Sequence, residues 1–514
     1  MNEKSLILAI DCGTSSVRTI IFDSLTGKQL SVSQSRWKRK PDEHGATHFD
    51  TKNNWRLICN LIHKTISGYD PKKILGITTT SFRHGLVCID KNGEEVFACH
   101  NADARSNEQV KKLKETGLGT EVFKISGDYP TINALPILMW LRENSPVKYN
   151  TIWKALSVAG WVTYKLSEKA FIEPSMASAT CLFDIHTLTW SSEILKAVKI
   201  NEAILPSVVE SDQVIGGLTN DVAKEVGLIE NTPVYVSLGD TQAAMTATND
   251  VSANRSSVIG GTFWLHAQTT DRPITDETMR MRTQCHCVKK IWFNEGCSFY
   301  VGPIFSWFVE NFCSNYSKSN EKTFKELTEK AAKVPAGAYG IQMVFSNLTN
   351  VSNWKHASPA ILNWDIFDSK RSNKAVFFRA LLENAALLTY GEFLMIKEIT
   401  GKWPEMLTFS GGASNNYLLA QIIADTVGVP VRILKNKECS ALGGVMTASV
   451  STGIYDSLNS CADYFLEIEK EFRPFKRNHR VYKDKYMQWR DIYKRMLELS
   501  DNGLTKHLWK AAGS

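Results

Sequence analysis

The stretch Leu6-Ile7-Leu8-Ala9-Ile10-Asp11-Cys12-Gly13-Thr14-Ser15-Ser16-Val17 sets a short polar turn between two apolar runs. The runs, residues 6–10 and 17–22, are rich in branched apolar side chains and predict two strands. The turn offers a glycine, three consecutive hydroxyl side chains and backbone N–H groups, a combination that can hold phosphate. Because no helical pattern follows the glycine, the stretch predicts an antiparallel meander and excludes a Rossmann-type β–α unit.

A second glycine turn lies near the other end of the chain. Ser410-Gly411-Gly412-Ala413-Ser414 precedes an apolar helical pattern over residues 417–427. Glycine lets a flat ligand such as an adenine ring lie directly against the backbone. The alternative is a turn that only helps the helix to pack. Two such turns, far apart in the sequence, predict a nucleotide held between two lobes.

A third turn, Gly260-Gly261-Thr262, again lies between two strand patterns and resembles the first turn. This repetition predicts two lobes of related α/β fold. A chain of 514 residues is also too long for one hydrophobic core. The polar stretch 248–255 is the expected boundary, which gives an N-terminal lobe over residues 1–248 and a C-terminal lobe over residues 249–514.

Several further elements follow from the hydrophobic periodicity. Residues 50–67 and 376–399 have helical spacing, and residues 74–79 predict a strand. Residues 234–238 predict another strand, with a helix over 243–247 after it. Polar residues follow both strands, so both strand ends are candidate site positions.

The composition limits the class of protein. The net charge of +7 is mild for this length and fits an anionic nucleotide better than nucleic acid. The 11 cysteines lack regular spacing, which is typical of reduced thiols, so a cytoplasmic location is expected. Cys285-His286-Cys287 is spaced too tightly for ordinary zinc chelation and predicts a structural role. No apolar run is long enough for a membrane span, so we expect neither a membrane nor a nucleic-acid partner.

Two polar clusters are candidates for chemistry. Asp240 follows a predicted strand, where a carboxylate can accept a hydroxyl proton during phosphoryl transfer. Its alternative role is to cap the helix that follows. Arg83 and His84 follow another strand and could bind a polyhydroxy substrate, although a lone histidine is more often structural.

Together these motifs resemble the FGGY carbohydrate kinase family, whose members have two actin-like (ribonuclease H-like) lobes with a nucleotide cleft between them. The matching segments occur in family order and cover nearly the whole chain. They are Asp11 to Arg18, Asp240, Gly260-Gly261-Thr262, and residues 409–416 together with 438–448.

The resemblance implies the roles of individual residues. Asp240 would be the catalytic base, and Asp11 with Asp240 would hold Mg²⁺. The phosphoryl donor would be ATP, bound by Gly13, Thr14, Ser15, Arg18, Gly261, Thr262, Gly411, Gly412, Ala413 and Asn416. A small polyhydroxy substrate would be bound by Arg83, His84, Asp240, Thr241 and Trp264.

Within the family the chain most resembles the autoinducer-2 kinases, on segments such as Trp354-Lys355-His356-Ala357 and the tail Leu508-Trp509-Lys510-Ala511. This implies phosphorylation of linear 4,5-dihydroxypentane-2,3-dione on its terminal hydroxyl. His84 stands where a glutamate is expected among these kinases, while a histidine nearby is typical of xylulose kinases, so a pentulose kinase is the alternative. A non-catalytic actin-like nucleotide-binding protein is a more distant one. Protein partners, including a homodimer, are left open.

Overall fold

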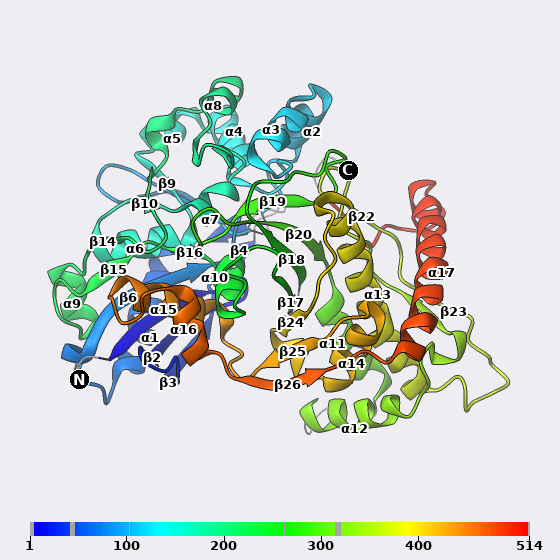
Figure 1. Cartoon of the computed structure of the whole chain (residues 1–514). Coiled ribbons are helices and arrows are strands. Elements are labelled where there is room, and N and C mark those ends of the chain that lie inside the picture. The colour runs from blue at the N-terminus through cyan, green and yellow to red at the C-terminus, as the bar shows by residue number, and fades with distance from the viewer. Residues whose placement is uncertain (1–4, 42–46, 102, 262, 314–319, 512–514) are drawn as a thin grey trace.

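Two large mixed sheets organise the computed structural model, which describes residues 5–41, 47–101, 103–261, 263–313 and 320–511. Figure 1 shows the sheets in two lobes that lie side by side, the first built mainly from the N-terminal half of the chain and the second from the C-terminal half. Each lobe also carries helices on its sheet. The arrangement is the two-lobed α/β fold that the sequence predicts.

The first sheet has the strand order β14-β15-β6-β1-β2-β3, and β16 also pairs with β6. The strands β1, β2 and β3 form an antiparallel meander, while β6 and β15 run parallel to β1. The bounds are β1 (Leu6–Cys12), β2 (Ser16–Asp23), β3 (Gln29–Arg36), β6 (Ile74–Ser81), β14 (Val214–Gly217), β15 (Pro233–Tyr235) and β16 (Leu238–Gly239).

The second sheet has the order β19-β20-β18-β17-β24-β25-β26. It repeats the plan of the first: β17, β18 and β20 are antiparallel neighbours, and β24 and β25 run parallel to β17. The predicted relation between the two lobes is therefore confirmed. The bounds are β17 (Ser256–Gly260), β18 (Trp264–Thr270), β19 (Arg282–Cys285), β20 (Trp292–Ser298), β24 (Leu407–Ser410), β25 (Val431–Leu434) and β26 (Ile468–Phe472).

A third sheet, in the order β4-β5-β8-β7-β9, belongs to the first lobe, and pairs of short strands complete the described β-structure. The remaining strands are β4 (Arg39–Pro41), β5 (Thr47–Phe49), β7 (Leu86–Ile89), β8 (Glu95–Cys99), β9 (Lys154–Leu156), β10 (Phe171–Ile172), β11 (Phe183–Asp184), β12 (Thr189–Trp190), β13 (Ser207–Val208), β21 (Gln342–Val344), β22 (Lys355–His356), β23 (Ala360–Leu362) and β27 (Trp509–Lys510).

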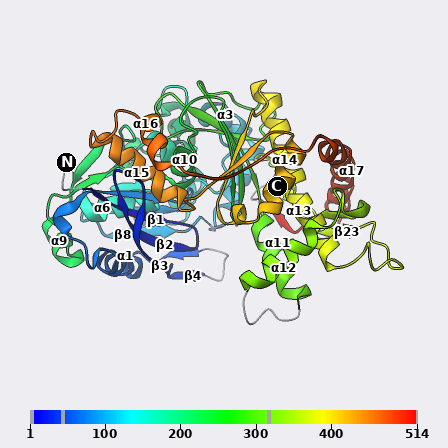
Figure 2. The ribbon, with the colours of Figure 1, turned by 60° about the horizontal axis from the view of Figure 1, so that its bottom comes forward.

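The helices cover both faces of the two large sheets. In Figure 2, α1 lies along β2 and β3 of the first lobe, and α11 and α12 lie on the second lobe. The helices are α1 (Thr51–Ile66), α2 (Asn107–Glu115), α3 (Leu118–Ser126), α4 (Ala134–Asn144), α5 (Pro146–Thr151), α6 (Val158–Ser167), α7 (Pro174–Ser178), α8 (Ser192–Val198), α9 (Asn220–Val226), α10 (Asp240–Ala247), α11 (Val301–Phe312), α12 (Asn320–Ala332), α13 (Lys374–Thr400), α14 (Tyr417–Val427), α15 (Cys439–Ser451), α16 (Leu458–Phe465) and α17 (Lys476–Asp501).

Strand β1 is buried along its whole length because helices pack on both of its faces. Side chains alternate between the faces of a strand. Leu8 and Ile10 accordingly pack in one core cluster with Ile58 of α1, while Ile7 packs in another cluster with Leu442 of α15. The continuous apolar run that predicts β1 is thus the signature of a strand covered on both sides.

Helix α15 comes late in the chain but packs on the sheet of the first lobe, as does α16 (Figure 1). It also lies against α10, the helix that begins at Asp240. The close approach needs glycine, because a Cβ at Gly444 would stand 2.7 Å from the Thr78 hydroxyl oxygen. The packing of α15 therefore connects the part of the chain that follows the second glycine turn to the first lobe.

The segment Cys285-His286-Cys287 lies in the interior of the protein. Cys285 and Cys287 are buried, and the His286 Nδ1 accepts a hydrogen bond from the backbone of Val288. The described residues hold no group of three potential metal ligands. None of the described helices combines the length and the apolar content needed to cross a bilayer.

Candidate active site

Asp240 is the first residue of α10 and follows the short strand β16 at the end of the first sheet. Gly239, and not Asp240, occupies the N-cap position. The Asp240 side chain is half-buried, and its Oδ1 accepts a hydrogen bond from the Thr241 backbone N–H at 2.7 Å. The carboxylate is therefore held at a defined position while part of it remains accessible, as a proton acceptor requires.

Asp11 lies one residue before the end of β1 and is buried. Its Oδ1 accepts a hydrogen bond from the Thr80 hydroxyl at 2.8 Å, and its Oδ2 lies 3.6 Å from Nη1 of Arg18. The same Arg18 nitrogen donates to Oε2 of Glu438 at 3.1 Å. Arg18 thus connects the first turn to the start of α15, and Glu438 joins the set of acidic groups at the site.

Burial raises the pKa of both aspartates, and the charge of Asp11 adds to the rise at Asp240. Burial raises the pKa of Asp240 to about 6; Arg83 opposes this rise and the negative charge of Asp11 adds to it. Burial likewise raises the pKa of Asp11, against the effects of Thr80 and Arg18. A pKa near the pH of a cell is what a general base needs.

The same two carboxylates suit a magnesium ion. Two buried acids that repel each other are stabilised by a cation, and Mg²⁺ is usually held by one or two carboxylates together with water and substrate phosphates. Among the described residues there is no cluster of three potential ligands. Asp11 and Asp240 would therefore share the ion with the nucleotide, and the ion would offset the charge of the phosphates.

The first glycine turn is fixed from behind through its carbonyl groups. The indole N–H of Trp37 donates to the Gly13 carbonyl at 2.7 Å, and Nε2 of His100 lies 2.8 Å from the carbonyl oxygen of Thr14. The side chains of Thr14 and Ser15 remain partly or fully exposed. The turn is thus held in place by these two contacts, and the hydroxyl of Ser15 lies exposed at its surface.

The second and third glycine turns lie directly against each other. Gly411 has a φ of +81°, and a Cβ there would stand 2.6 Å from the carbonyl oxygen of Gly260. Gly261 is exposed, and Thr262 lies outside the described residues. Gly412 is exposed as well, and no described atom lies within 4 Å of where its Cβ would be. This open backbone surface is suited to a flat ring.

The remaining residues predicted to contact adenosine take part in local structure. Asn416 caps α14, with its side-chain oxygen accepting from the Leu419 backbone N–H at 3.1 Å. Its amide nitrogen lies 3.3 Å from the Thr328 hydroxyl. Ala413 packs partly against the core of the second lobe. Both residues stay partly exposed beside Gly412.

The predicted substrate residues divide into two groups. Arg83, His84 and Thr241 lie in the loop after β6 and at the start of α10, and Arg83 is close enough to Asp240 to affect its pKa. Trp264 instead is fully buried and packs against Phe409, with ring centroids 5.5 Å apart. This placement corrects the expectation that Trp264 closes the pocket, because its neighbour Phe263 is the exposed ring.

His84 is a neutral, conformationally unusual residue. Its φ is 72°, a conformation uncommon for residues with a side chain and one that often marks a functional position. Burial lowers its pKa well below the usual range, with further contributions from Arg282 and Arg83. Its Nδ1 lies 3.4 Å from the Asn133 amide nitrogen. A neutral imidazole has one hydrogen-bond donor and one acceptor, so it can bind hydroxyl groups without carrying a charge.

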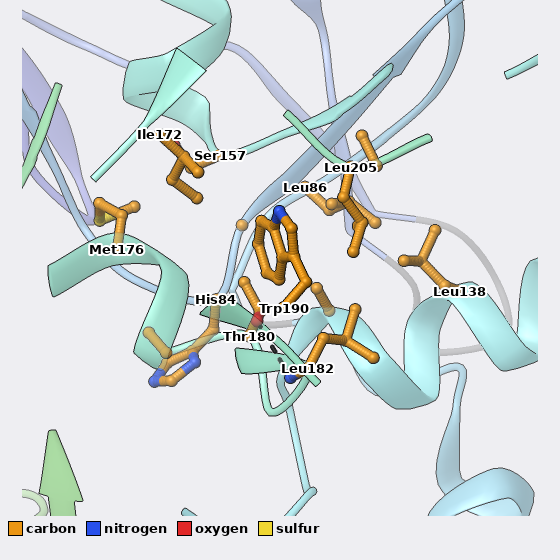
Figure 3. Close-up of a pocket in the computed structure, with 14 residues that line it drawn as sticks. His84, Leu86, Leu138, Ser157, Ile172, Met176, Thr180, Leu182, Trp190 and Leu205 are labelled. Carbon is orange, nitrogen blue, oxygen red and sulfur yellow. Dashed lines mark hydrogen bonds between the residues drawn. The ribbon is translucent and has the colours of Figure 1, made fainter. Parts of the chain in front are cut away.

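The cavity behind His84 is too small for a sugar. Its walls are mostly aliphatic, and Trp190 forms one of them (Figure 3). Its volume is about 30 Å³, room for about two water molecules. A sugar therefore does not fit this cavity, and the polar region around Asp240 is the candidate substrate site.

Sequence reasoning missed four charged or polar residues of this region: Asp128, Arg282, Gln284 and Glu295. All four are buried. Arg282 and Gln284 alternate along β19, and Glu295 faces Arg282 across the strand pair. No local pattern marks these residues: β19 is polar along most of its length, and Asp128 lies in a loop between α3 and α4.

Comparison with known proteins defines the class. The N-terminal domain model of the FGGY family of carbohydrate kinases matches residues 6–247, and the C-terminal domain model of the same family matches residues 256–452. The chain therefore belongs to the FGGY family of carbohydrate kinases.

The similar curated proteins include the autoinducer-2 kinases of Yersinia enterocolitica and Photorhabdus laumondii. Each is 34% identical to the chain over 518 residues, covering 99% of this chain and 98% or 97% of the relative. Solved structures with a similar fold include the xylulose kinase from Rhodospirillum rubrum, with a TM-score of 0.86 and 18% identity over 96% of this chain and 99% of that one. Another is the glycerol kinase from Plasmodium falciparum with ADP, with a TM-score of 0.85 and 21% identity over 96% and 98%.

Proposed function

We propose that the chain transfers the γ-phosphoryl group of ATP to the terminal hydroxyl of a small sugar-like molecule, and that this molecule is autoinducer-2 in its linear form, 4,5-dihydroxypentane-2,3-dione. The observation that carries the reaction is the half-buried Asp240 at the start of α10, with its pKa raised to about 6 beside Asp11 and Arg83. The identity of 34% to autoinducer-2 kinases over nearly the whole chain supports the substrate.

The transfer step follows from the position of Asp240. The substrate hydroxyl gives its proton to the Asp240 carboxylate, and its oxygen forms a bond to the γ-phosphorus. The bond from that phosphorus to the β–γ bridging oxygen breaks, and ADP leaves with the electron pair. Magnesium held by Asp11 and Asp240 would neutralise phosphate charge.

The glycine turns would hold the two ends of the nucleotide. Thr14, Ser15 and Gly261 would contact phosphates, and the open backbone at Gly412 would receive the adenine ring. Arg18 is bound to Glu438, so its charge would act on phosphates from this fixed position. Because the turns belong to different lobes, a bound nucleotide would connect them.

A pentulose kinase is the second candidate, and His84 is the observation that favours it. The neutral imidazole beside Asn133 offers hydrogen-bonding groups that suit the hydroxyls of a pentulose. Both candidates use the same base and the same donor. They differ only in the acceptor that fits between Arg83, His84 and Asp240.

A panel experiment tests the proposal. The purified protein is incubated with MgATP and, separately, with the dione, xylulose, other pentuloses and glycerol, and ADP release and product mass are measured. We expect the dione to give the highest kcat/KM and a product heavier by one phosphoryl group. A pentulose in first place would favour the second candidate. Phosphorylation of no compound would indicate a non-catalytic nucleotide-binding protein.

A further inference from the structure

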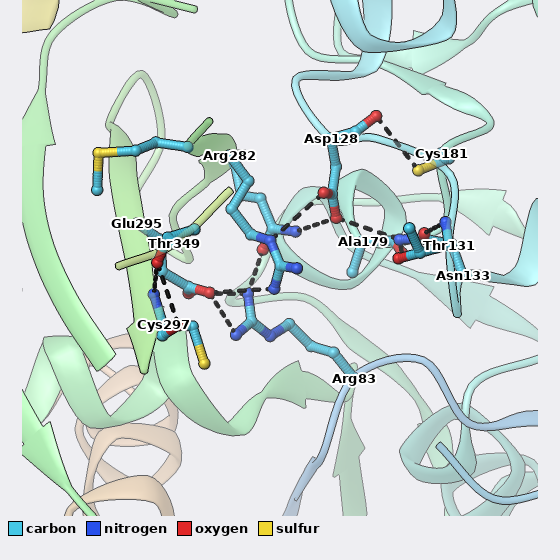
Figure 4. Close-up of polar contacts among 12 residues, drawn as sticks. Arg83, Asp128, Thr131, Asn133, Ala179, Cys181, Arg282, Glu295, Cys297 and Thr349 are labelled. Atoms are coloured by element: carbon cyan, nitrogen blue, oxygen red, sulfur yellow. Dashed lines mark hydrogen bonds and ion pairs between the residues drawn. The ribbon is translucent and has the colours of Figure 1, made fainter. Parts of the chain in front are cut away.

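Arg83, a predicted substrate residue of the first lobe, is held by a carboxylate of the second lobe. Its Nη2 donates to Oε1 of Glu295 at 3.0 Å, and its Nη1 lies 2.9 Å from Oε2 of the same residue (Figure 4). Glu295 lies on β20, and its side chain is fully buried. This two-point contact fixes the plane of the guanidinium group and its rotation.

The contact continues back into the first lobe. Arg282 of β19 donates to Oε1 of Glu295 at 3.2 Å, and its Nε lies 3.4 Å from Oδ1 of Asp128 (Figure 4). The Asn133 amide then donates to Oδ2 of Asp128 at 3.1 Å and lies 3.4 Å from Nδ1 of His84. We call the chain of contacts formed by Arg83, Glu295, Arg282, Asp128, Asn133 and His84 the interlobe network.

The interlobe network starts and ends at two adjacent residues, Arg83 and His84, both predicted to bind substrate. It also touches the helix that carries the catalytic aspartate. The Gln242 amide of α10 donates to Oε1 of Gln284 at 3.3 Å, and Arg83 donates to the same oxygen. Residues of the second lobe therefore fix the side chains that surround the acceptor site on the first.

Burying the charged groups of the network costs desolvation free energy, which offsets the attraction between them. The four charged side chains, two cations and two anions, have exposed fractions of 7% or less. Buried ion pairs of this kind are often no more stabilising than apolar residues of similar volume. Their value lies in fixing one geometry. Arg83 and Asp128 come from the first lobe and Arg282 and Glu295 from the second, so this geometry exists only while the lobes are in contact.

Arg83 keeps hydrogen-bonding capacity for a ligand. A guanidinium group has five N–H donors, and the described contacts engage three of them, one with Gln284 and two with the carboxylate of Glu295. Its charge also acts on Asp240. An acceptor molecule beside Asp240 can therefore bind an Arg83 that is already oriented.

We propose that Glu295 is a positioning residue: it holds Arg83 in the orientation that binds the acceptor, with Arg282 and Asp128 holding Glu295 in turn. Acceptor binding is thereby coupled to contact between the lobes. The proposal rests on the proposed kinase function and adds to it a determinant of acceptor affinity that lies in the second lobe.

The first test is Glu295→Gln, which keeps the shape of the side chain and removes its charge. We expect kcat/KM for the acceptor to fall by about tenfold to a hundredfold, mainly through KM, because a misplaced binding group costs this much. KM for ATP should stay near that of the wild type.

The matched control is Glu392→Gln, another fully buried glutamate, which lies behind the same strand and binds Thr349 and Ser298 instead. It should leave the acceptor KM unchanged even if it lowers the melting temperature.

A double-mutant cycle separates positioning from general damage. In an Arg83→Gln background, adding Glu295→Gln should change kcat/KM by about twofold or less, because the second substitution has no arginine left to release. Independent, multiplicative effects would overturn the proposal, as would a normal acceptor KM in Glu295→Gln alone. If Glu295→Gln fails to fold, Glu295→Asp takes its place in the cycle.

The acceptor in these assays is whichever panel compound the wild type phosphorylates with the highest kcat/KM. If that compound is a pentulose, the dione assignment fails while the cycle still tests Glu295. If the wild type phosphorylates no compound, both proposals are overturned together.

Discussion

Gly443 of α15 lies directly against the carbonyl group of Ala243 in α10. A Cβ added at position 443 would stand 1.8 Å from that carbonyl oxygen, well inside any tolerated contact. Helix α10 begins at Asp240, so the packing of α15 against α10 helps to set where the Asp240 carboxylate lies. The second half of the chain thus contributes to the position of a residue that belongs to the first lobe.

Gly443→Ala should therefore reduce activity strongly. The added methyl group must push α10 away by more than an ångström, and a displacement of that size at a catalytic group costs about a hundredfold in rate. Gly444→Ala is the comparison, because its Cβ would meet the side chain of Thr78 on β6 and not the backbone of α10, so it should cost stability without displacing Asp240. Steady-state kcat and melting temperature of both variants are the measurements. Equal loss in the two variants would contradict this account of α10.

Asp240→Asn should fold and bind ATP but lose kcat by roughly three orders of magnitude or more, because the proton acceptor is removed. Asp250→Asn provides the comparison. Asp250 lies just after the same helix and is buried, and burial raises its pKa to about 7. It bonds to Thr248 instead of facing the site. Near wild-type turnover in Asp240→Asn would rule out the assigned base.

The acid limb of the pH profile should reflect Asp240. The base acts when deprotonated, so kcat/KM should be full above a pKa of about 6 and fall as the pH drops through that value. Asp11 raises the pKa of Asp240, so Asp11→Asn should move the limb of the residual activity to lower pH. The measurement is kcat/KM from pH 5 to pH 8. A limb that stays in place in Asp11→Asn would show that another group titrates.

Local sequence patterns were sufficient for the strands and turns but not for the contacts between lobes. The apolar run of β1 and the glycine turns could be predicted, because residues close in the sequence determine the structure of a strand or a turn. The helix predicted over residues 243–247 begins earlier, at Asp240, since its first turn is polar. Glu295, in contrast, meets Arg83 from 212 residues away, and no local pattern encodes such a pairing.

The expectation that Trp264 closes the pocket failed for a similar reason, because local sequence did not determine its contacts. The start of β18, Trp264-Leu265-His266-Ala267, has no polar alternation, so the sequence does not show which side faces the core. The structure buries Trp264 and His266 and leaves Leu265 partly exposed. Only the packing of β18 in the folded chain fixes which of its sides faces the core.

Two adjacent glycines should respond in opposite ways to substitution. Gly412→Val adds a side chain into open space, so it should leave the melting temperature near that of the wild type while raising KM for ATP by about tenfold or more, if adenine lies there. Gly411→Ala places a Cβ against the Gly260 carbonyl at a φ of +81°. It should lower the melting temperature, because both the contact and the left-handed backbone are unfavourable. An unchanged KM for ATP in Gly412→Val would move the adenine site elsewhere.

The C-terminal tail, which has no catalytic group of its own, should influence acceptor binding through an aromatic cluster. Trp509 of β27 pairs with His356 of β22, and its ring lies 4.7 Å from that of Phe299. Phe299 in turn lies 5.0 Å from the exposed ring of Phe263, and Trp354 packs beneath Arg282 of the interlobe network. Removing the indole would take away one of the rings that pack against Phe299 and Trp354.

Trp509→Ala should therefore lower the free energy of unfolding by about 1–3 kcal/mol, as expected for an aromatic side chain that is only partly buried, and should raise the acceptor KM with little change in KM for ATP. Trp509→Phe should restore much of both properties, because it keeps a ring against Phe299. Chemical denaturation and initial-rate kinetics on the three proteins are the measurements. A loss of stability without any change in acceptor KM would limit the tail to a structural role.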